Sequence, residues 1–225
     1  MNQTTTFVNG SFVVIAGRPA MGKSALALDI AEHLAQHSDK NILIVSLEMS
    51  KEQIMFRLQK AYNNQSHKNI VVCDEPVIMT VKTIRELCES TKNLGAVIID
   101  YLQLICSEEK STKTQSRYEQ LDDISRELKI MARNLNVPVI CTSQLSKKCE
   151  LRSDKRPTIS DLCHTRVNEH AMDQIIFLYR DRYYNPETPV GDMAECIIAK
   201  NRYGDIGTIK LRWDPERVAF SLWEE

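Results

Sequence analysis

Five short apolar runs, rich in Val and Ile, constrain the fold of this chain more than any other feature. The runs are continuous rather than alternating, which is typical of strands that are buried on both faces of a parallel sheet. The sequence therefore predicts a mainly parallel central sheet with helices on its faces. The five runs are Phe12–Ala16, Ile42–Leu47, Ala96–Asp100, Pro138–Ser143 and Gln174–Tyr179.

Amphipathic helical patterns lie between these runs. One pattern places apolar residues on a single helical face from Leu121 to Leu135, with Asp, Glu, Lys and Arg opposite. Similar patterns occupy Lys23–Gln36, Lys51–Tyr62 and Val81–Lys92. Because strands and helices alternate, the sequence predicts an α/β doubly wound domain.

The pattern changes after Tyr179. Three segments, Met193–Ala199, Thr208–Arg212 and Val218–Leu222, have the character of strands joined by short turns that contain Gly or Pro. This arrangement predicts antiparallel strands at the C-terminal edge of the sheet.

Charge and cysteine content exclude several classes of protein. The 29 basic and 30 acidic residues nearly cancel, so only a local basic loop would attract nucleic acid. No apolar run approaches the roughly 18 residues of a membrane span, and the start MNQTTTFVNG lacks the features of a secretory signal. The seven cysteines include no C-x-x-C pair, which favours free thiols in a cytoplasmic protein over a zinc site or a disulfide framework.

The octapeptide GRPAMGKS matches the pattern G-x-x-x-x-G-K-[ST], follows a predicted strand and opens a predicted helix. Backbone N–H groups of such a loop bind phosphate, and Lys23 supplies a positive charge to the β- and γ-phosphates. The Ser24 hydroxyl is placed to bind Mg²⁺. The motif therefore predicts a site for ATP and Mg²⁺. Its residues are Gly17, Arg18, Pro19, Ala20, Met21, Gly22, Lys23 and Ser24.

Two carboxylates follow other predicted strands. Asp100 ends the segment V-I-I-D, which is the Walker B pattern whose Asp holds Mg²⁺ through water. Glu48 follows the run Ile42–Leu47, which we place beside the P-loop strand in the sheet. From that position its carboxylate reaches the γ-phosphate side and activates water. The alternative for Glu48 is a surface carboxylate at a strand end.

Other polar residues at predicted strand ends are further candidates. Gln144 either hydrogen-bonds the γ-phosphate or caps its strand. Lys200 and Arg202 project in the same direction, toward a nucleotide in this chain or in a neighbour, or they form an ordinary solvated edge. His33 and His37 are spaced four residues apart on a predicted helix but lack an H-E-x-x-H pattern. We therefore expect these histidines on the outer face of the helix rather than in a metal site.

Seven segments occur in the order seen in one known family. From about Gly10 to Phe220 the chain resembles the C-terminal RecA-like motor domain of DnaB-type hexameric replicative helicases. The resemblance implies a RecA-like P-loop NTPase fold and one motor domain over residues 1–225, without the N-terminal domain and most of the linker helix of the family. The segments are GRPAMGKS, SLEMSKEQIMFR, IIDYLQL, LNVPVICTSQL, DKRPTISDL, FLYRD and IIAKNRYGDIGT.

The resemblance also implies a role for each candidate residue. Arg57 matches an arginine near the nucleotide base, and Lys200 and Arg202 match a pair that enters the ATP site of the neighbouring subunit. The remaining matches are Glu48 as the catalytic glutamate, Lys23 and Ser24 as ligands of phosphate and Mg²⁺, Asp100 as the Walker B carboxylate and Gln144 as the γ-phosphate sensor.

Two charged stretches match the family loops that track single-stranded DNA in the ring channel, namely Ser107–Arg117 and Ser146–Arg166. The chain departs from the family after the second of them. The usual D-L-R-E-S-G-x-I-E-Q-D-A-D is replaced by DLCHTRVNEHAMD over Asp161–Asp173, so the usual phosphate-gripping residues are missing. A solvated loop is the alternative for the remaining cations. The candidate DNA contacts are Lys147, Lys148, Arg152, Lys155, Arg156 and Arg166.

The leading hypothesis is an ATP-driven motor that moves on single-stranded DNA and unwinds duplex as a homohexameric ring, with primase or a helicase loader as candidate partners. The alternative is a RecA-fold ATPase that has lost translocation and acts as a partner-binding or recombination-related module. Stimulation of ATPase activity by single-stranded DNA discriminates between them. A P-loop kinase is disfavoured, because no segment resembles a lid that binds a phosphate acceptor.

Overall fold

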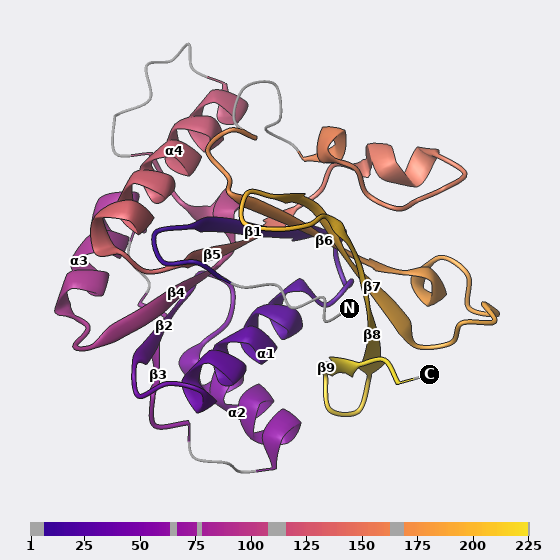
Figure 1. The fold of residues 1–225 in the computed structure, drawn as a ribbon, viewed down its shortest axis with the longest axis horizontal. Coiled ribbons are helices and arrows are strands. Elements are labelled where there is room, and N and C mark those ends of the chain that lie inside the picture. Colours follow the sequence, from indigo (N-terminus) through magenta and orange to yellow (C-terminus); the bar gives the residue numbers. More distant parts are fainter. Residues whose placement is uncertain (1–6, 64–66, 76–77, 108–115, 163–168, 225) are drawn as a thin grey trace.

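One mixed sheet organises the molecule, with its strands in the order β3-β2-β4-β5-β1-β6-β7-β8-β9 (Figure 1). The structure is a computed structural model that describes residues 7–63, 67–75, 78–107, 116–162 and 169–224. Among these residues, no helix is both long and apolar enough to cross a membrane.

The first six strands are parallel, as the continuous apolar runs predicted. β1 lies between β5 and β6, and β4 joins β5 to β2. β3 pairs with β2 at the edge of the sheet and was not predicted. The bounds are Phe12–Gly17 for β1, Asn41–Ser46 for β2, Ile70–Cys73 for β3, Leu94–Asp100 for β4, Val139–Gln144 for β5 and Gln174–Arg180 for β6.

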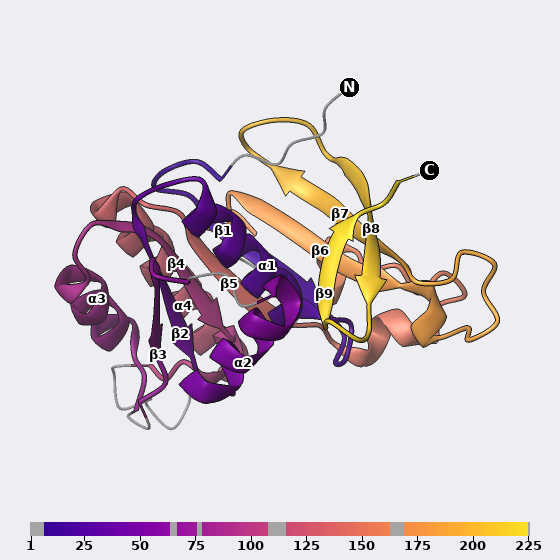
Figure 2. The same ribbon diagram turned by 90° about the horizontal axis from the view of Figure 1, so that it is seen from below.

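The C-terminal strands are antiparallel, which confirms the prediction of antiparallel strands at the C-terminal edge of the sheet. β7 (Met193–Asn201) pairs with β6, β8 (Gly207–Asp214) pairs with β7, and β9 (Ala219–Leu222) pairs with β8. This part of the sheet extends beyond the helices, and β9 returns to contact α1 (Figure 2). The C-terminal strands thereby reach the helix that follows the phosphate loop.

Helices cover both faces of the parallel part (Figures 1 and 2). α1 (Lys23–Gln36) and α2 (Lys51–Tyr62) lie on one face, and α3 (Val81–Ser90) and α4 (Arg117–Leu135) lie on the other. In the described parts of the chain, four short 3₁₀ helices occupy connections between the main elements. They are η1 (Leu102–Leu104), η2 (Lys147–Leu151), η3 (Ile159–Asp161) and η4 (Asp181–Tyr183).

Strand β1 shows why the apolar runs are continuous. Val13 and Ile15 join the apolar cluster beneath α1 and α2, whereas Phe12, Val14 and Ala16 join the cluster beneath α3 and α4. All five side chains are fully buried. Both faces of the strand therefore need apolar residues, since neither face meets water.

The helices begin in two different ways. α2 and α4 start with capping boxes, in which the side chains of Ser50 and Ser116 accept hydrogen bonds from backbone N–H groups of the first turn. α1 starts at Gly22, which has a left-handed φ of 100° and provides no side-chain cap. The first N–H groups of α1 therefore remain available to an anion.

The strand order corrects one prediction. We expected the strand that precedes Glu48 to lie beside the P-loop strand, but β4 and β5 separate β2 from β1. The expectation was wrong because apolar runs identify strands without saying which crossover inserts later strands between earlier ones.

Candidate active site

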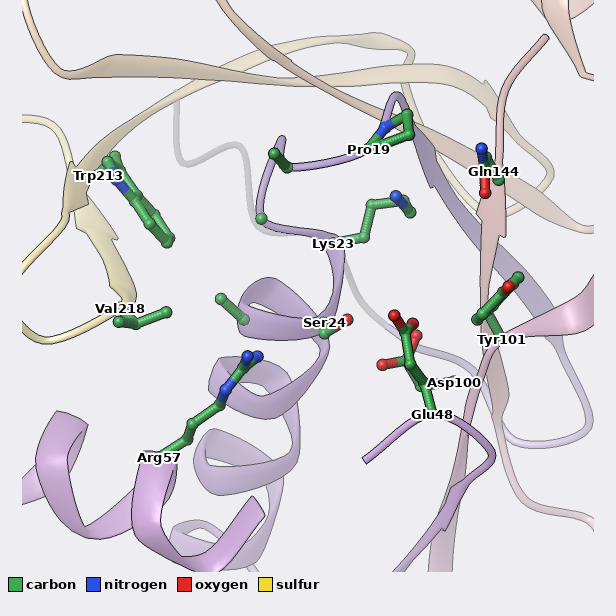
Figure 3. Close-up of a pocket in the computed structure, with 13 residues that line it drawn as sticks. Pro19, Lys23, Ser24, Glu48, Arg57, Asp100, Tyr101, Gln144, Trp213 and Val218 are labelled. Atoms are coloured by element: carbon green, nitrogen blue, oxygen red, sulfur yellow. The ribbon is translucent and has the colours of Figure 1, made fainter. Parts of the chain in front are cut away.

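A pocket of about 360 Å³ opens at the carboxyl edge of the parallel strands (Figure 3). Loops that leave the carboxyl ends of parallel strands meet at one edge, where open α/β sheets bind ligands. The predicted residues that line it include Lys23, Ser24, Glu48, Asp100 and Gln144.

The phosphate loop forms one wall of the pocket through Pro19, Ala20 and Gly22. Gly22 is required for two reasons. Its φ of 100° disfavours a side chain, and a Cβ there would lie 2.8 Å from the ring of Phe220. The second glycine of the motif therefore allows the loop to approach the C-terminal strands closely.

Two predicted residues of the phosphate loop have side chains outside the pocket. Met21 is 1% exposed and belongs to the apolar cluster under α1. The Arg18 guanidinium is buried, with Nε 2.8 Å from Oε1 of Glu150 and Nη1 donating to the carbonyl of Leu145 at 2.8 Å. Neither side chain lines the pocket. Both side chains instead anchor the loop to the rest of the protein, Met21 by apolar packing and Arg18 by its hydrogen bonds.

Lys23 brings positive charge into the pocket. Its Nζ donates to the carbonyl of Arg18 at 3.2 Å. Burial lowers the pKa of its ammonium, and the nearby carboxylates of Asp100 and Glu48 oppose that change. The side chain is therefore held in place while the ammonium still has donors for an anionic ligand.

Asp100 has one oxygen occupied and one without a partner. The hydroxyl of Thr142 donates to Oδ1, whereas buried Oδ2 has no hydrogen bond among the described residues. A buried carboxylate oxygen without a partner, near the hydroxyl of Ser24 in the same pocket, suits a hydrated Mg²⁺. Ser24 and Asp100 thus fit the predicted metal role, and Thr142 is a support that the sequence did not reveal.

Glu48 reaches the pocket through β4 rather than through β1. The N–H of Leu47 donates to the carbonyl of Asp100 at 2.8 Å, which extends the β2–β4 pairing beyond β2. This contact places the exposed Glu48 beside Asp100, as Figure 3 shows. Glu48 therefore lines the pocket together with Asp100, although the predicted neighbour strand was wrong.

Gln144 ends β5, and Gln103 fixes its position. Its N–H donates to Oε1 of Gln103 at 3.2 Å, and Nε2 of Gln103 donates to the hydroxyl of Ser143 at 3.0 Å. Arg117, the first residue of α4, donates to the carbonyls of Gln103 and Ile105, each at 2.9 Å. A chain of hydrogen bonds therefore runs from the backbone of Gln144 to the start of α4.

Arg57, Trp213 and Val218 form the other side of the pocket, across Lys23 from Asp100 (Figure 3). Arg57 comes from α2. Trp213 and Val218 were missed, because they reach the pocket only when β9, which pairs with β8, folds back against α1. The guanidinium of Arg180 lies 4.4 Å from the centre of the Trp213 ring.

Lys200 and Arg202 lie at the opposite end of β1 from the pocket. Lys200 donates to the carbonyl of Glu169, and Arg202 donates to the carbonyl of His170 at 2.7 Å and to Oδ1 of Asp173 at 3.3 Å. The N–H of Asp173 in turn donates to the carbonyl of the first residue of β1 at 2.8 Å. Lys200 and Arg202 are therefore too far away to contact a nucleotide in the pocket of their own chain. A nucleotide in a neighbouring chain and an ordinary solvated edge remain as the alternatives.

The basic stretch after β5 is divided by its contacts. Lys147 and Lys148 on η2 are exposed. Arg152 instead forms two hydrogen bonds with the carboxylate of Asp161, at 2.8 and 2.7 Å, and Arg156 forms two with Glu195, at 2.8 and 2.6 Å. The two lysines therefore remain candidates for DNA contact, whereas both arginines stabilise the loop.

Two predicted DNA elements lie outside the described residues in part or whole. These are Arg166 and most of the stretch Ser107–Arg117.

Lys155, a further candidate for DNA contact, lies over the ring of Tyr184, 5.6 Å from its centre.

The remaining candidates for metal binding do not assemble. Among the described residues, no group of three His, Cys, Asp or Glu side chains is placed to hold a metal ion. His33 and His37 are exposed on α1, with ring centres 4.1 Å apart, as expected for an outer helix face. The described cysteines are free thiols.

Comparison with known proteins gives consistent matches over nearly the whole chain. Residues 2–64 and 55–222 match the family described as the DnaB-like helicase C terminal domain. The replicative DNA helicase DnaB of Geobacillus stearothermophilus is 36% identical over 96% of this chain and 53% of its own length. The replicative DNA helicase DnaC of Bacillus subtilis is 37% identical with the same coverage. The chain thus spans about half the length of these curated relatives.

Two solved structures have the same fold. A DnaB-like replicative helicase, described together with its interactions with primase, superposes with a TM-score of 0.88 at 35% identity over 97% of this chain and 58% of that chain. A second structure, described as an ATPase domain, superposes with a TM-score of 0.87 at 35% identity over 97% of this chain and 86% of that chain. These similarities confirm the predicted α/β fold.

Proposed function

Because the chain belongs to the DnaB-like helicase C-terminal domain family, we propose that it is the ATP-hydrolysing motor of a replicative DNA helicase. The motor couples hydrolysis to translocation on single-stranded DNA and to duplex unwinding. The observation that carries this proposal is the single pocket that contains Lys23, Ser24, Asp100 and Glu48.

The pocket provides a distinct group for each requirement of phosphoryl transfer. The uncapped start of α1 and the Lys23 ammonium bind the phosphates of ATP. Ser24 and Asp100 hold Mg²⁺, which neutralises charge on the phosphate oxygens when bound. Glu48 accepts a proton from the attacking water, because its exposed carboxylate lies beside Asp100 at the pocket edge.

Loss of the γ-phosphate is transmitted through Gln144. Its side chain lines the pocket, while its backbone is bonded to Gln103 and through it to Arg117. A shift of Gln144 toward or away from the γ-phosphate therefore reaches the start of α4. The candidate DNA-tracking stretch ends at that point.

A neighbouring subunit completes the site. Lys200 and Arg202 are too far from the pocket of their own chain, at the other end of β1, and an arginine supplied in trans accelerates hydrolysis in related chemistry. We therefore propose a homohexameric ring in which each subunit supplies this pair to the next.

Single-stranded DNA is the proposed track, held in part by the exposed Lys147 and Lys148. Cations on an otherwise neutral body bind the phosphate backbone without regard to sequence. One solved relative was described together with its interactions with primase, which supports primase as a partner class for this chain as well. A cytoplasmic location agrees with the free thiols of the described cysteines.

The test compares ATP hydrolysis with and without single-stranded DNA, together with displacement of a strand from a tailed duplex. We expect DNA-stimulated hydrolysis and strand displacement from the wild type. Glu48→Gln should bind ATP yet hydrolyse it at least about a hundredfold more slowly, because proton transfer is lost. Glu86→Gln, an exposed glutamate on α3, is the matched control and should behave as wild type. Normal hydrolysis by Glu48→Gln would refute the proposed role of Glu48.

A second function is favoured by the altered loop. The family residues that grip DNA phosphates are replaced at Cys163 and His164, while Arg152 and Arg156 are engaged by Asp161 and Glu195. A RecA-fold ATPase that binds a partner without translocating would show hydrolysis that single-stranded DNA leaves unchanged. The same DNA titration therefore separates the two functions.

A further inference from the structure

We infer that Asp29 is a positioning residue for the nucleoside half of the pocket, an inference that rests on the proposed binding of ATP. Asp29 lies on α1, less than two turns after the phosphate loop, and does not line the pocket. Any effect on the nucleotide must therefore pass through the residues that it contacts.

The carboxylate of Asp29 joins three elements. Oδ1 accepts the hydroxyl of Tyr62 at 2.5 Å, and Oδ2 accepts the backbone N–H of Phe220 at 2.7 Å. Tyr62 is the last residue of α2, and Phe220 lies in β9. One side chain therefore ties α1, the end of α2 and the last strand of the sheet.

The contact with Tyr62 fixes the helix that carries Arg57. Burial and the Asp29 carboxylate raise the pKa of the Tyr62 hydroxyl, so this group remains a donor. Arg217 lies in the turn between β8 and β9. Its guanidinium donates to the carbonyl of Ala61, the residue that precedes Tyr62. The end of α2 is thus bonded directly to the C-terminal hairpin at Ala61 and linked to it through Asp29 at Tyr62.

The contact with Phe220 fixes the opposite wall. The ring of Phe220 lies against Gly22, where a Cβ would come within 2.8 Å, and against Trp213, with ring centres 4.8 Å apart. Trp213 and Val218 line the pocket across from Arg57 (Figure 3). A displacement of Phe220 therefore displaces the apolar surface on which a base would rest.

The phosphate half of the pocket is held by other contacts. Lys23 is bonded to the carbonyl of Arg18, Asp100 to the hydroxyl of Thr142, and the segment before Glu48 to the carbonyl of Asp100. Asp29 takes part in none of these bonds. The hydrogen bonds that hold the phosphate half are thus separate from those of Asp29, although the ring of Phe220 also lies against Gly22 of the phosphate loop.

This separation defines the experiment, which uses the full chain and two ligands. ATP needs both halves of the pocket, whereas inorganic tripolyphosphate, a competitive inhibitor without a nucleoside, needs only the phosphate half. For Asp29→Ala we expect the KM for ATP to rise about tenfold with kcat within about twofold, because two hydrogen bonds to a charged group are lost. The inhibition constant of tripolyphosphate should remain at the wild-type value.

Two milder variants guard against a general loss of folding. Asp29→Asn should stay within about twofold of the wild-type KM, because its amide accepts from Phe220 and donates to the oxygen of Tyr62. Tyr62→Phe removes one of the two contacts and should raise the KM by a smaller factor than Asp29→Ala. Thermal melts accompany each variant to compare their folded fractions.

The outcomes are distinct. An equal loss of affinity for ATP and tripolyphosphate would overturn the inference, because Asp29 would then act on the whole pocket. An unchanged KM in Asp29→Ala and Tyr62→Phe would overturn it as well. Failure of the wild type to bind ATP would instead refute the proposed function on which the inference rests.

Discussion

Nε of Arg18 lies 2.8 Å from Oε1 of Glu150, and this ion pair joins the phosphate loop to the 3₁₀ helix that carries Lys147 and Lys148. The same guanidinium donates to the carbonyl of Leu145, between β5 and that helix. The buried guanidinium of Arg18 therefore links the phosphate loop to the candidate DNA-binding segment.

Removing this ion pair should separate nucleotide binding from the response to DNA. Glu150→Ala leaves the Arg18 guanidinium without its carboxylate, so we expect a stability loss of about 1 kcal/mol, limited by the partial exposure of Glu150. The affinity for ATP should remain near wild type, whereas stimulation of hydrolysis by single-stranded DNA should fall. Glu187→Ala, at an exposed glutamate, is the control. Undiminished stimulation in Glu150→Ala would show that the ion pair does not couple the two sites.

The support of Asp100 by Thr142 predicts a magnesium phenotype. Thr142→Val removes the hydroxyl that donates to Oδ1 and leaves a buried carboxylate without that bond, which costs about 1–3 kcal/mol. We expect a higher Mg²⁺ concentration for half-maximal hydrolysis, measured by titration at saturating ATP. Thr142→Ser retains the hydroxyl and should restore the wild-type titration. Identical curves for Val and Ser would contradict the role of this hydrogen bond.

The position of Arg202 predicts complementation between subunits. Arg202→Ala should bind ATP normally but hydrolyse it poorly, because its own pocket does not contain the residue. Mixing it with Glu48→Gln should restore part of the activity, since some interfaces then combine an intact pocket with an intact Arg202. Steady-state hydrolysis over a series of mixing ratios provides the measurement. A purely proportional decline across that series would argue against action in trans.

The exposed lysines of η2 predict a change in salt dependence. Replacing both Lys147 and Lys148 by Ala should make the plot of log affinity against log salt shallower by about 0.7 per lost phosphate contact for single strands. Fluorescence anisotropy of a labelled oligonucleotide over a salt series gives the slope. Arg152→Ala is the informative control, because its guanidinium is bonded to Asp161 and its loss should lower the melting temperature without changing the slope. Equal slopes for the wild type and the double variant would show that neither lysine contacts a DNA phosphate.

Asp29 predicts a dependence of stability on pH. Burial, opposed by hydrogen bonds from Tyr62 and Phe220, raises the pKa of this carboxyl from 3.8 to about 6. A raised pKa means that the folded state favours the protonated form, so stability from this group is present at low pH and is lost as pH rises through about 6. The loss amounts to at most about 3 kcal/mol.

Asp29→Asn carries no titrating group and should not show this loss. The free energy of unfolding of the variant minus that of the wild type should increase from about pH 4 to pH 6 and then level off, because other titrating groups cancel in the difference. Urea unfolding at several pH values measures it. A difference that does not vary with pH would mean that Asp29 has an ordinary pKa in the folded protein.

The sequence predicted the parts of the fold that local pattern encodes. Buried strands such as β1 are apolar at every position, and the P-loop needs its glycine and lysine at fixed spacing, so both are visible without a structure. β3 was missed because it has only four residues, of which Ile70 alone is buried. The position of β2 was mispredicted because pairing between distant strands leaves no local signal.

The site was predictable where chemistry requires one residue type. Lys23, Ser24 and Asp100 follow from what phosphate and Mg²⁺ demand, whereas Glu48 was inferred from the family resemblance and from a strand order that was wrong. The structure places all four in one pocket. Supports such as Thr142 and Gln103 have ordinary local sequences and acquire a role only through tertiary contact. Arg152 shows the opposite case. Its place in a charged loop made it a candidate for DNA contact, but its guanidinium is hydrogen-bonded to the buried carboxylate of Asp161.

The pocket and the Lys200–Arg202 pair lie at opposite ends of the same strand. If one subunit's pair completes the next subunit's pocket in a head-to-tail arrangement, each subunit uses two different surfaces and the interface is heterologous. An open row of subunits always leaves one pocket at its end unfinished, whatever its length. Closure removes that end, and the number of complete sites then equals the number of subunits.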